Sequence, residues 1–190
     1  MTGPLKHIPN VLTGLRLLAA PAIAVLLLLD HYSAALAVFL FAGVSDLIDG
    51  YLAKRYHMAT RLGRYLDPAA DKALMFACFV VLAFQGVVPV LLAAVVIGRD
   101  VLMVLGIIVA RLAGAELTVT PLRIGKLSTV VQVAFIALQL FSLAFAIDID
   151  AWQRWTALIV GVVTVASAWT YGALWLRAMS RGNKRRRGRH

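Results

Sequence analysis

Acidic residues and cysteine are both scarce in this sequence. It has nine Asp and Glu residues against nineteen Lys and Arg, which gives a formal net charge of +10. The single cysteine, Cys78, lies within an apolar run, so a disulfide inside the chain is excluded and a small buried apolar role is expected. The first ten residues are too short and polar for the apolar core of a signal peptide, and we expect them at a membrane interface. No internal repeat and no separate soluble domain is apparent.

Apolar residues are abundant, at 62% of the chain with a mean hydropathy of +0.86, well above soluble proteins. Apolar runs of membrane-spanning length recur, and they are too long for the strands of a membrane barrel. Because each span must satisfy its own backbone hydrogen bonds in lipid, helices are expected. The sequence predicts an all-α polytopic membrane protein, with residues 1–180 as one six-helix catalytic domain and 181–190 as a disordered tail. The six predicted transmembrane helices cover residues 11–29, 33–55, 64–84, 88–113, 124–146 and 152–179.

Basic residues are confined to alternate connections between these spans. The first, third and fifth connections carry no Lys or Arg, whereas the second, the fourth and the C-terminal tail are basic. The positive-inside rule then places both termini in the cytoplasm, and a bacterial inner membrane is the expected setting. The tail is interpreted as a solvated segment beside anionic lipid headgroups. No nucleic-acid partner is expected, because the tail has no aromatic residues for stacking and no folded binding module beside it.

Four of the nine acidic residues fall within 26 residues, at the ends of the second and third predicted spans: Asp46, Asp49, Asp67 and Asp71. Carboxylates at membrane depth are costly and are kept mainly for function. The first pair is three residues apart and the second pair four, so each pair shares one helix face. Four converging acids would repel one another without a cation between them. A divalent metal ion bound by oxygen ligands is therefore the first hypothesis, and nearby Arg and Lys suit phosphate chemistry.

The full spacing resembles the signature of the CDP-alcohol phosphatidyltransferase family, Asp-x2-Asp-Gly-x2-Ala-Arg-x8-Gly-x3-Asp-x3-Asp. Seven of its eight fixed positions match, with every gap of the right length: Asp46, Asp49, Gly50, Ala53, Gly63, Asp67 and Asp71. The departure is Lys54, where the family has Arg. Lysine keeps the charge but loses the bidentate fork, and the adjacent Arg55 is a candidate to replace it.

This resemblance implies a six-span homodimer whose site opens to the cytoplasmic leaflet. The four aspartates would hold one or two Mg²⁺ or Mn²⁺ ions on the pyrophosphate of CDP-diacylglycerol. Asp71 would also be the general base on the hydroxyl of the acceptor alcohol, and CMP would leave. The nucleotide would be bound at the remaining motif positions, which are Gly50, Ala53, Lys54 and Gly63.

Four basic residues are further candidates to bind the acceptor or a phosphate: Arg16, Arg99, Arg123 and Lys126. Each has a structural alternative: a side chain reaching the interface, a helix-packing ion pair, or ordinary positive-inside charge. The stretches GRDVLMV and IGKLSTVVQV resemble the cardiolipin synthase branch, so phosphatidylglycerol is the expected acceptor. Glycerol 3-phosphate, which gives phosphatidylglycerophosphate, is the alternative. A proton or cation transporter is the rival class, but its acids would be spread along a pathway.

Overall fold

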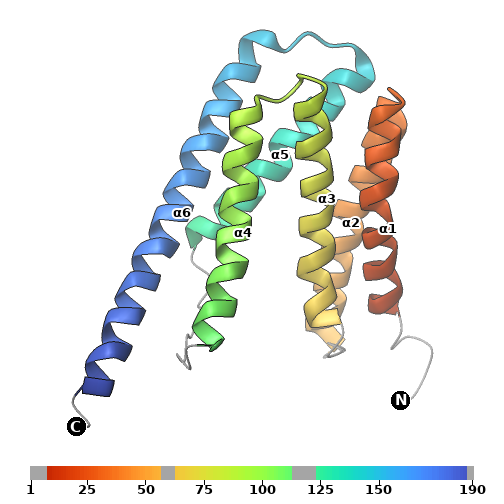
Figure 1. Ribbon diagram of the computed structural model, residues 1–190. Helices are drawn as coiled ribbons and strands as arrows, with labels where there is room; N and C mark the ends of the chain where they lie inside the picture. The colour runs from red at the N-terminus through yellow and green to blue at the C-terminus, as the bar shows by residue number, and fades with distance from the viewer. Residues whose placement is uncertain (1–7, 57–62, 113–122, 188–190) are drawn as a thin grey trace. The chain divides into compact units, whose positions relative to one another are not determined.

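The chain folds into six helices, with no strand among the residues that the structure describes. A computed structural model describes residues 8–56, 63–112 and 123–187 (Figure 1). The all-α prediction is confirmed for this part of the chain. The helices are α1 (Ile8–Leu28), α2 (Tyr32–Tyr56), α3 (Gly63–Phe84), α4 (Val90–Leu112), α5 (Arg123–Phe145) and α6 (Asp150–Arg187).

Helix α6 is longer than the sequence predicts. It continues to Arg187, so residues 181–187 are helical where a disordered tail is expected. Lys and Arg are good helix formers, and no proline interrupts this run. Their charge makes the segment soluble, but it does not prevent the helix from propagating out of the apolar span. The last three residues of the predicted tail lie outside the described residues.

Three helices end in the same kind of turn. In each, a residue with positive φ follows the helix: Asp30 (φ 57°), Gly86 (φ 76°) and Ala146 (φ 51°). The amide of the next residue then bonds to a carbonyl five residues earlier, as in His31 to Leu26 at 2.8 Å. This is the Schellman arrangement, which satisfies carbonyls left open at a helix end. Short turns of this kind return the chain at once, so the connections contain few residues.

Within the part of the chain that the structure describes, two stretches are long and apolar enough to cross a membrane, by length and composition: Arg123–Phe145 and Ala151–Ala173. Two shorter apolar helical stretches are Gly14–Leu28 and Tyr32–Ile48. Large apolar side chains are exposed on every helix, including Leu47, Leu91 and Trp169, each at least 74% exposed. Such surfaces are unfavourable in water and suit a lipid or protein partner. Six spans remain a prediction.

The helices divide between two compact units. The first comprises residues 1–88 and 136–150, and therefore holds α1, α2, α3 and the end of α5. Helix α1 packs against both α2 and α3 (Figure 1). Its core consists of side chains with no exposed surface, which include Ile23, Leu27, Phe79, Leu82, Ile136 and Leu140.

The second unit comprises residues 89–135 and 151–190, which hold α4, the start of α5, and α6. Its apolar core includes Leu92, Val96 and Val160. Its interior also holds an unusual share of buried polar side chains, all at most 4% exposed: Arg99, Ser128, Gln132, Thr164 and Ser167. Each unit therefore carries its own cluster of polar groups, one acidic and one mainly hydroxyl and amide.

Candidate active site

One arginine nitrogen joins two of the four motif aspartates in the first unit. Nη1 of Arg16, on α1, donates to Oδ1 of Asp46 on α2 and to Oδ1 of Asp71 on α3, the latter at 2.8 Å. Two carboxylates that are 25 positions apart in the sequence thus converge on a single cation. The predicted meeting of these acids from two helices is seen directly for this pair.

Small side chains allow the three helices to approach closely beside this cluster. Alanines within about one turn of Arg16, Asp46 or Asp71 are at most 9% exposed: Ala19, Ala20, Ala42 and Ala70. Ser45, next to Asp46, is also buried. Small residues at helix contacts are typical of packing in membranes, because they let backbones come together. A long arginine on α1 can then reach both partner helices at once.

The three charged side chains of this cluster interact strongly with one another. Both oxygens lie within hydrogen-bond distance of one nitrogen, so they are at most about 6 Å apart. At that separation two carboxylates repel by about 3 kcal/mol for an effective dielectric of 20. Arg16 offsets this repulsion and is itself stabilised by the acids, since its side chain is only 3% exposed. The carboxylates are 46% and 45% exposed, so they face away from the protein interior.

The other motif residues lie on the same two helices. Asp49, Gly50, Ala53 and Lys54 are within α2, and Gly63 and Asp67 are within α3. Their side chains fall outside the described residues. Because both helices are continuous, Asp49 shares a face with Asp46, and Asp67 with Asp71. Among the side chains that are described, no group of three or more His, Cys, Asp or Glu residues is present.

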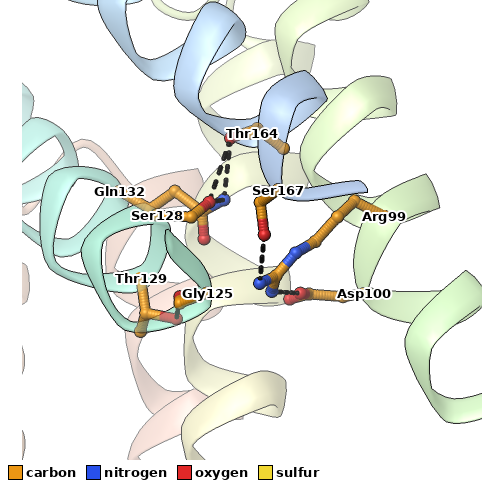
Figure 2. Close-up of polar contacts among 8 residues, drawn as sticks. All are labelled: Arg99, Asp100, Gly125, Ser128, Thr129, Gln132, Thr164 and Ser167. Atoms are coloured by element: carbon orange, nitrogen blue, oxygen red, sulfur yellow. Dashed lines mark hydrogen bonds and ion pairs between the residues drawn. The ribbon is translucent and has the colours of Figure 1, made fainter. Parts of the chain in front are cut away.

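In the second unit, Arg99 is held by two neighbours. Its Nη1 donates to Asp100 at 2.6 Å and its Nη2 to Oγ of Ser167 on α6 at 2.9 Å (Figure 2). The guanidinium also lies 5.9 Å from the ring centre of Tyr171, within the range of a cation–π contact. Arg99 is 4% exposed, and its Nε has no hydrogen-bond partner. This geometry favours the helix-packing alternative over direct phosphate binding.

A second polar group joins α5 to α6. Nε2 of Gln132 donates to Oγ1 of Thr164 at 3.0 Å and to Oγ of Ser128 at 3.2 Å (Figure 2). All three side chains are buried. Polar side chains that bond to each other in this way join helices where water is excluded.

The two remaining cations, Arg123 and Lys126, lie on the first turn of α5, and both are exposed. Between them is Gly125, against which the ring of Tyr171 packs. A Cβ atom at residue 125 would lie 2.5 Å from Oη of Tyr171. Exposed cations at a helix N-terminus suit an anionic ligand.

Sequence reasoning assigned no partner on another helix to Thr164, Ser167 or Tyr171. Their spacing of three and four residues places them on one face of α6, within an otherwise apolar helix. That polar stripe is the signal that could have identified them. The partner of each residue depends on the rotation of α4 and α5, which spacing along one helix does not give.

The fold and the acidic site define a helical protein with a carboxylate cluster beside apolar, membrane-compatible helices. Comparison with known families makes this specific. The sequence model of the CDP-alcohol phosphatidyltransferase family matches residues 6–166, which include all eight positions of the predicted motif. The chain belongs to the CDP-alcohol phosphatidyltransferase family. The predicted resemblance is confirmed.

Proteins similar to this chain include some named cardiolipin synthase and some named phosphatidylglycerophosphate synthase. A cardiolipin synthase (CMP-forming)/mitochondrial hydrolase fusion protein of Schizosaccharomyces pombe is 35% identical over 86% of this chain and 30% of its own. The human cardiolipin synthase (CMP-forming) is 29% identical over 86% of this chain and 60% of its own. A probable phosphatidylglycerophosphate synthase of Mycobacterium tuberculosis is 34% identical over 91% of this chain and 83% of its own. The chain therefore spans less than two thirds of the two cardiolipin synthases.

Proposed function

We propose that this protein transfers a phosphatidyl group from CDP-diacylglycerol to a glycerol-type alcohol, with release of CMP. The observation that carries the proposal is the convergence of Asp46 and Asp71 on Arg16. These two residues are the first and last aspartates of the family motif, and they come from different helices. Their approach supports the motif forming one site, as phosphoryl transfer by positioned charge requires.

The residues present fit a divalent metal ion. The family uses divalent metals. The motif supplies only oxygen donors, which hard cations prefer, and a cationic nitrogen already bridges two of these carboxylates. Asp46, Asp49, Asp67 and Asp71 would hold one or two Mg²⁺ or Mn²⁺ ions. When bound, the metal neutralises charge on the pyrophosphate oxygens and so makes CMP a better leaving group.

Asp71 is proposed as the general base. Its carboxylate is 45% exposed, so an acceptor hydroxyl can reach it. In the proposed step Asp71 takes the hydroxyl proton while the alcohol oxygen forms a bond to the β-phosphorus. The bond from that phosphorus to the CMP oxygen breaks, and CMP leaves with the electron pair. No covalent enzyme intermediate is needed, because positioned charge carries the reaction.

The remaining predicted roles divide by position. Gly50, Ala53, Lys54 and Gly63 would bind the nucleotide. Arg123 and Lys126 would bind the anionic acceptor, which their exposure on the first turn of α5 supports. For Arg99, whose two terminal nitrogens are engaged within the second unit, we propose a role in holding α4 to α6.

Phosphatidylglycerol is the proposed acceptor, which would make the product cardiolipin. The stretches GRDVLMV and IGKLSTVVQV support this choice. Glycerol 3-phosphate is the alternative, and the relatives named phosphatidylglycerophosphate synthase support it. The transporter alternative loses its support, because the family is one of transferases.

The proposed setting is a membrane crossed by six helices, with both termini in the cytoplasm. The family is membrane-associated. Exposed apolar side chains on all the helices support membrane insertion. A bacterial inner membrane and a homodimer complete the proposal, and CDP-diacylglycerol and the acceptor would both reach the site from the surrounding lipid.

The test is an assay of CMP release by the full-length protein, purified in detergent, with CDP-diacylglycerol and Mg²⁺ or Mn²⁺. Phosphatidylglycerol and glycerol 3-phosphate are supplied in turn. We expect CMP release with phosphatidylglycerol and its loss when EDTA removes the metal. Absence of CMP release with every alcohol would overturn the enzymatic proposal. Release with glycerol 3-phosphate alone would overturn the acceptor preference.

Asp71→Asn is the variant that tests the base. It should lower turnover by about 100-fold or more while the protein stays folded, since proton transfer contributes rate rather than stability. Asp148→Asn is the matched control, because Asp148 is an exposed acid outside the motif. It should leave turnover unchanged.

A further inference from the structure

Arg16 is more buried than an arginine that binds a substrate phosphate should be. A residue that binds substrate must present its N–H groups to an opening. The Arg16 side chain is 3% exposed, whereas the two carboxylates that it contacts are 46% and 45% exposed. The guanidinium therefore lies on the interior side of the carboxylates, and the carboxylates lie between it and the surroundings.

The contacts also tie three helices together at one point. Helix α1 packs against both α2 and α3, and Arg16 bonds to one acid on each of them. Both bonds go to an Oδ1 atom and come from the same nitrogen. The distance between the two carboxylates, and the direction in which each one points, are therefore set by α1.

We infer that Arg16 is a positioning residue that holds Asp46 and Asp71 by their inner oxygens and directs their exposed faces toward one metal ion. The inference rests on the proposed function, since it assigns the ligands of the metal site. Partners that orient metal-binding groups commonly set metal affinity, and their loss weakens binding by about 10–100-fold. Arg16 thus acts on substrate through the carboxylates and does not bind phosphate itself.

The positioning role and simple charge repulsion predict opposite changes in metal affinity when Arg16 is removed. If Arg16 only competed with the metal, its removal would tighten metal binding, because one positive charge beside the site would be gone. If Arg16 bound phosphate, its removal would leave metal binding tight in the absence of nucleotide. If Arg16 positions the acids, its removal weakens metal binding even when no substrate is present.

The experiment measures Mn²⁺ binding to the full-length protein in detergent, without nucleotide, by the electron paramagnetic resonance signal of free Mn²⁺. Arg16→Gln should weaken Mn²⁺ binding by about 10-fold or more. Arg16→Lys keeps the charge and should show a smaller loss, and it serves where the Gln variant does not fold. Arg154→Gln removes an exposed cation of the second unit and should bind Mn²⁺ like the wild type.

Unchanged or tighter Mn²⁺ binding in both Arg16 variants would overturn the positioning role while leaving the proposed function intact. A wild-type protein that binds no Mn²⁺ would overturn the metal site itself, and the inference with it. Equal weakening in Arg154→Gln would also overturn it, because the effect would then come from net charge. A loss confined to the Arg16 variants, smaller for Lys than for Gln, would establish it.

Discussion

At the scale of single residues, the turn after α5 has an alanine in a backbone conformation that favours glycine. Ala146 has φ 51°, in the left-handed region that glycine adopts most readily. The equivalent position after α3 is Gly86, with φ 76°. Both positions end a helix with the same hydrogen bond, which runs from Ile147 to Ser142 and from Val87 to Leu82. The two turns therefore form a matched pair that differs in residue type.

Opposite substitutions at this pair should have opposite effects on stability. Ala146→Gly should raise the free energy of unfolding by about 1 kcal/mol, because it removes the steric cost of a left-handed alanine. Gly86→Ala should lower it by a similar amount, about 1 kcal/mol, although no atom would clash with the new Cβ. Thermal unfolding in detergent measures both changes.

Ala144→Gly provides the control, since Ala144 lies within α5, where glycine is unfavourable. It should lower the melting temperature. A lower melting temperature for Ala146→Gly as well would show that the turn is not strained at this residue.

Single-residue reasoning from sequence predicted that Asp46 and Asp71 meet, as they do on Arg16, but it was incomplete for Arg16 itself. Helical spacing places Asp46 with Asp49 and Asp67 with Asp71, and that follows from the geometry of one helix. The bond from Arg16 to Asp46 and Asp71 depends on how α1 is rotated against two other helices. Spacing along a chain contains no information on that rotation. The sequence could therefore identify Arg16 as a candidate site residue, but it could not predict the two aspartates that Arg16 contacts.

At the scale of helices, the predicted boundaries are close to those observed because local chemistry fixes them. Turn residues stop α1, α3 and α5 at positions 28, 84 and 145, against predicted ends at 29, 84 and 146. The end of α6 was placed at residue 179 on the loss of apolar residues alone. Apolarity marks where a helix leaves the membrane, whereas helix propensity continues through the basic run to Arg187.

The contact between α5 and α6 depends on the absence of a side chain at Gly125. A Cβ there would lie 2.5 Å from Oη and 3.1 Å from Cε2 of Tyr171. The ring cannot simply move away without disturbing Arg99, whose guanidinium lies 5.9 Å from its centre. The closeness of these two helices is therefore set by a glycine and a tyrosine together.

Gly125→Ala should lower the free energy of unfolding by about 1–3 kcal/mol, which is typical of overpacking. It should also raise the KM for the acceptor, because Arg123 and Lys126 are on the same turn. Adding Tyr171→Ala should make the alanine at residue 125 nearly neutral, since the clashing ring is then gone. Thermal unfolding and acceptor titration measure the two effects.

Gly98→Ala is the matched control in the same unit, because a Cβ at that glycine would meet nothing within 4 Å. It should leave the KM nearly unchanged and should not lower the melting temperature, because alanine is the better helix former within α4. Equal effects of the two substitutions would mean that Tyr171 does not pack against Gly125 as described.

At the scale of the whole molecule, the decisive quantity is the number of times the chain crosses the membrane. Length and composition identify Arg123–Phe145 and Ala151–Ala173 as able to span, while the pattern of basic connections predicts six spans. Charged residues of the acidic site interrupt the apolar stretches of α2 and α3, which makes these two helices less apolar. A catalytic site at membrane depth necessarily lowers the apolar signal of the helices that carry it.

Single cysteines at His31, Asp148 and Gly188 distinguish the two topologies. The native Cys78 is fully buried and is replaced by alanine as background. Six spans place four crossings between residues 31 and 148 and one between 148 and 188. A membrane-impermeant maleimide should then label His31→Cys and Asp148→Cys in intact spheroplasts, but Gly188→Cys only after permeabilisation.

Two spans would give a different pattern, which makes the measurement decisive. With crossings only at Arg123–Phe145 and Ala151–Ala173, residues 31 and 188 share one side and residue 148 lies on the other. Labelling of Asp148→Cys alone, or of His31→Cys together with Gly188→Cys, would therefore refute six spans. The six-span pattern would place the connection between α2 and α3, beside the four motif aspartates, in the cytoplasm.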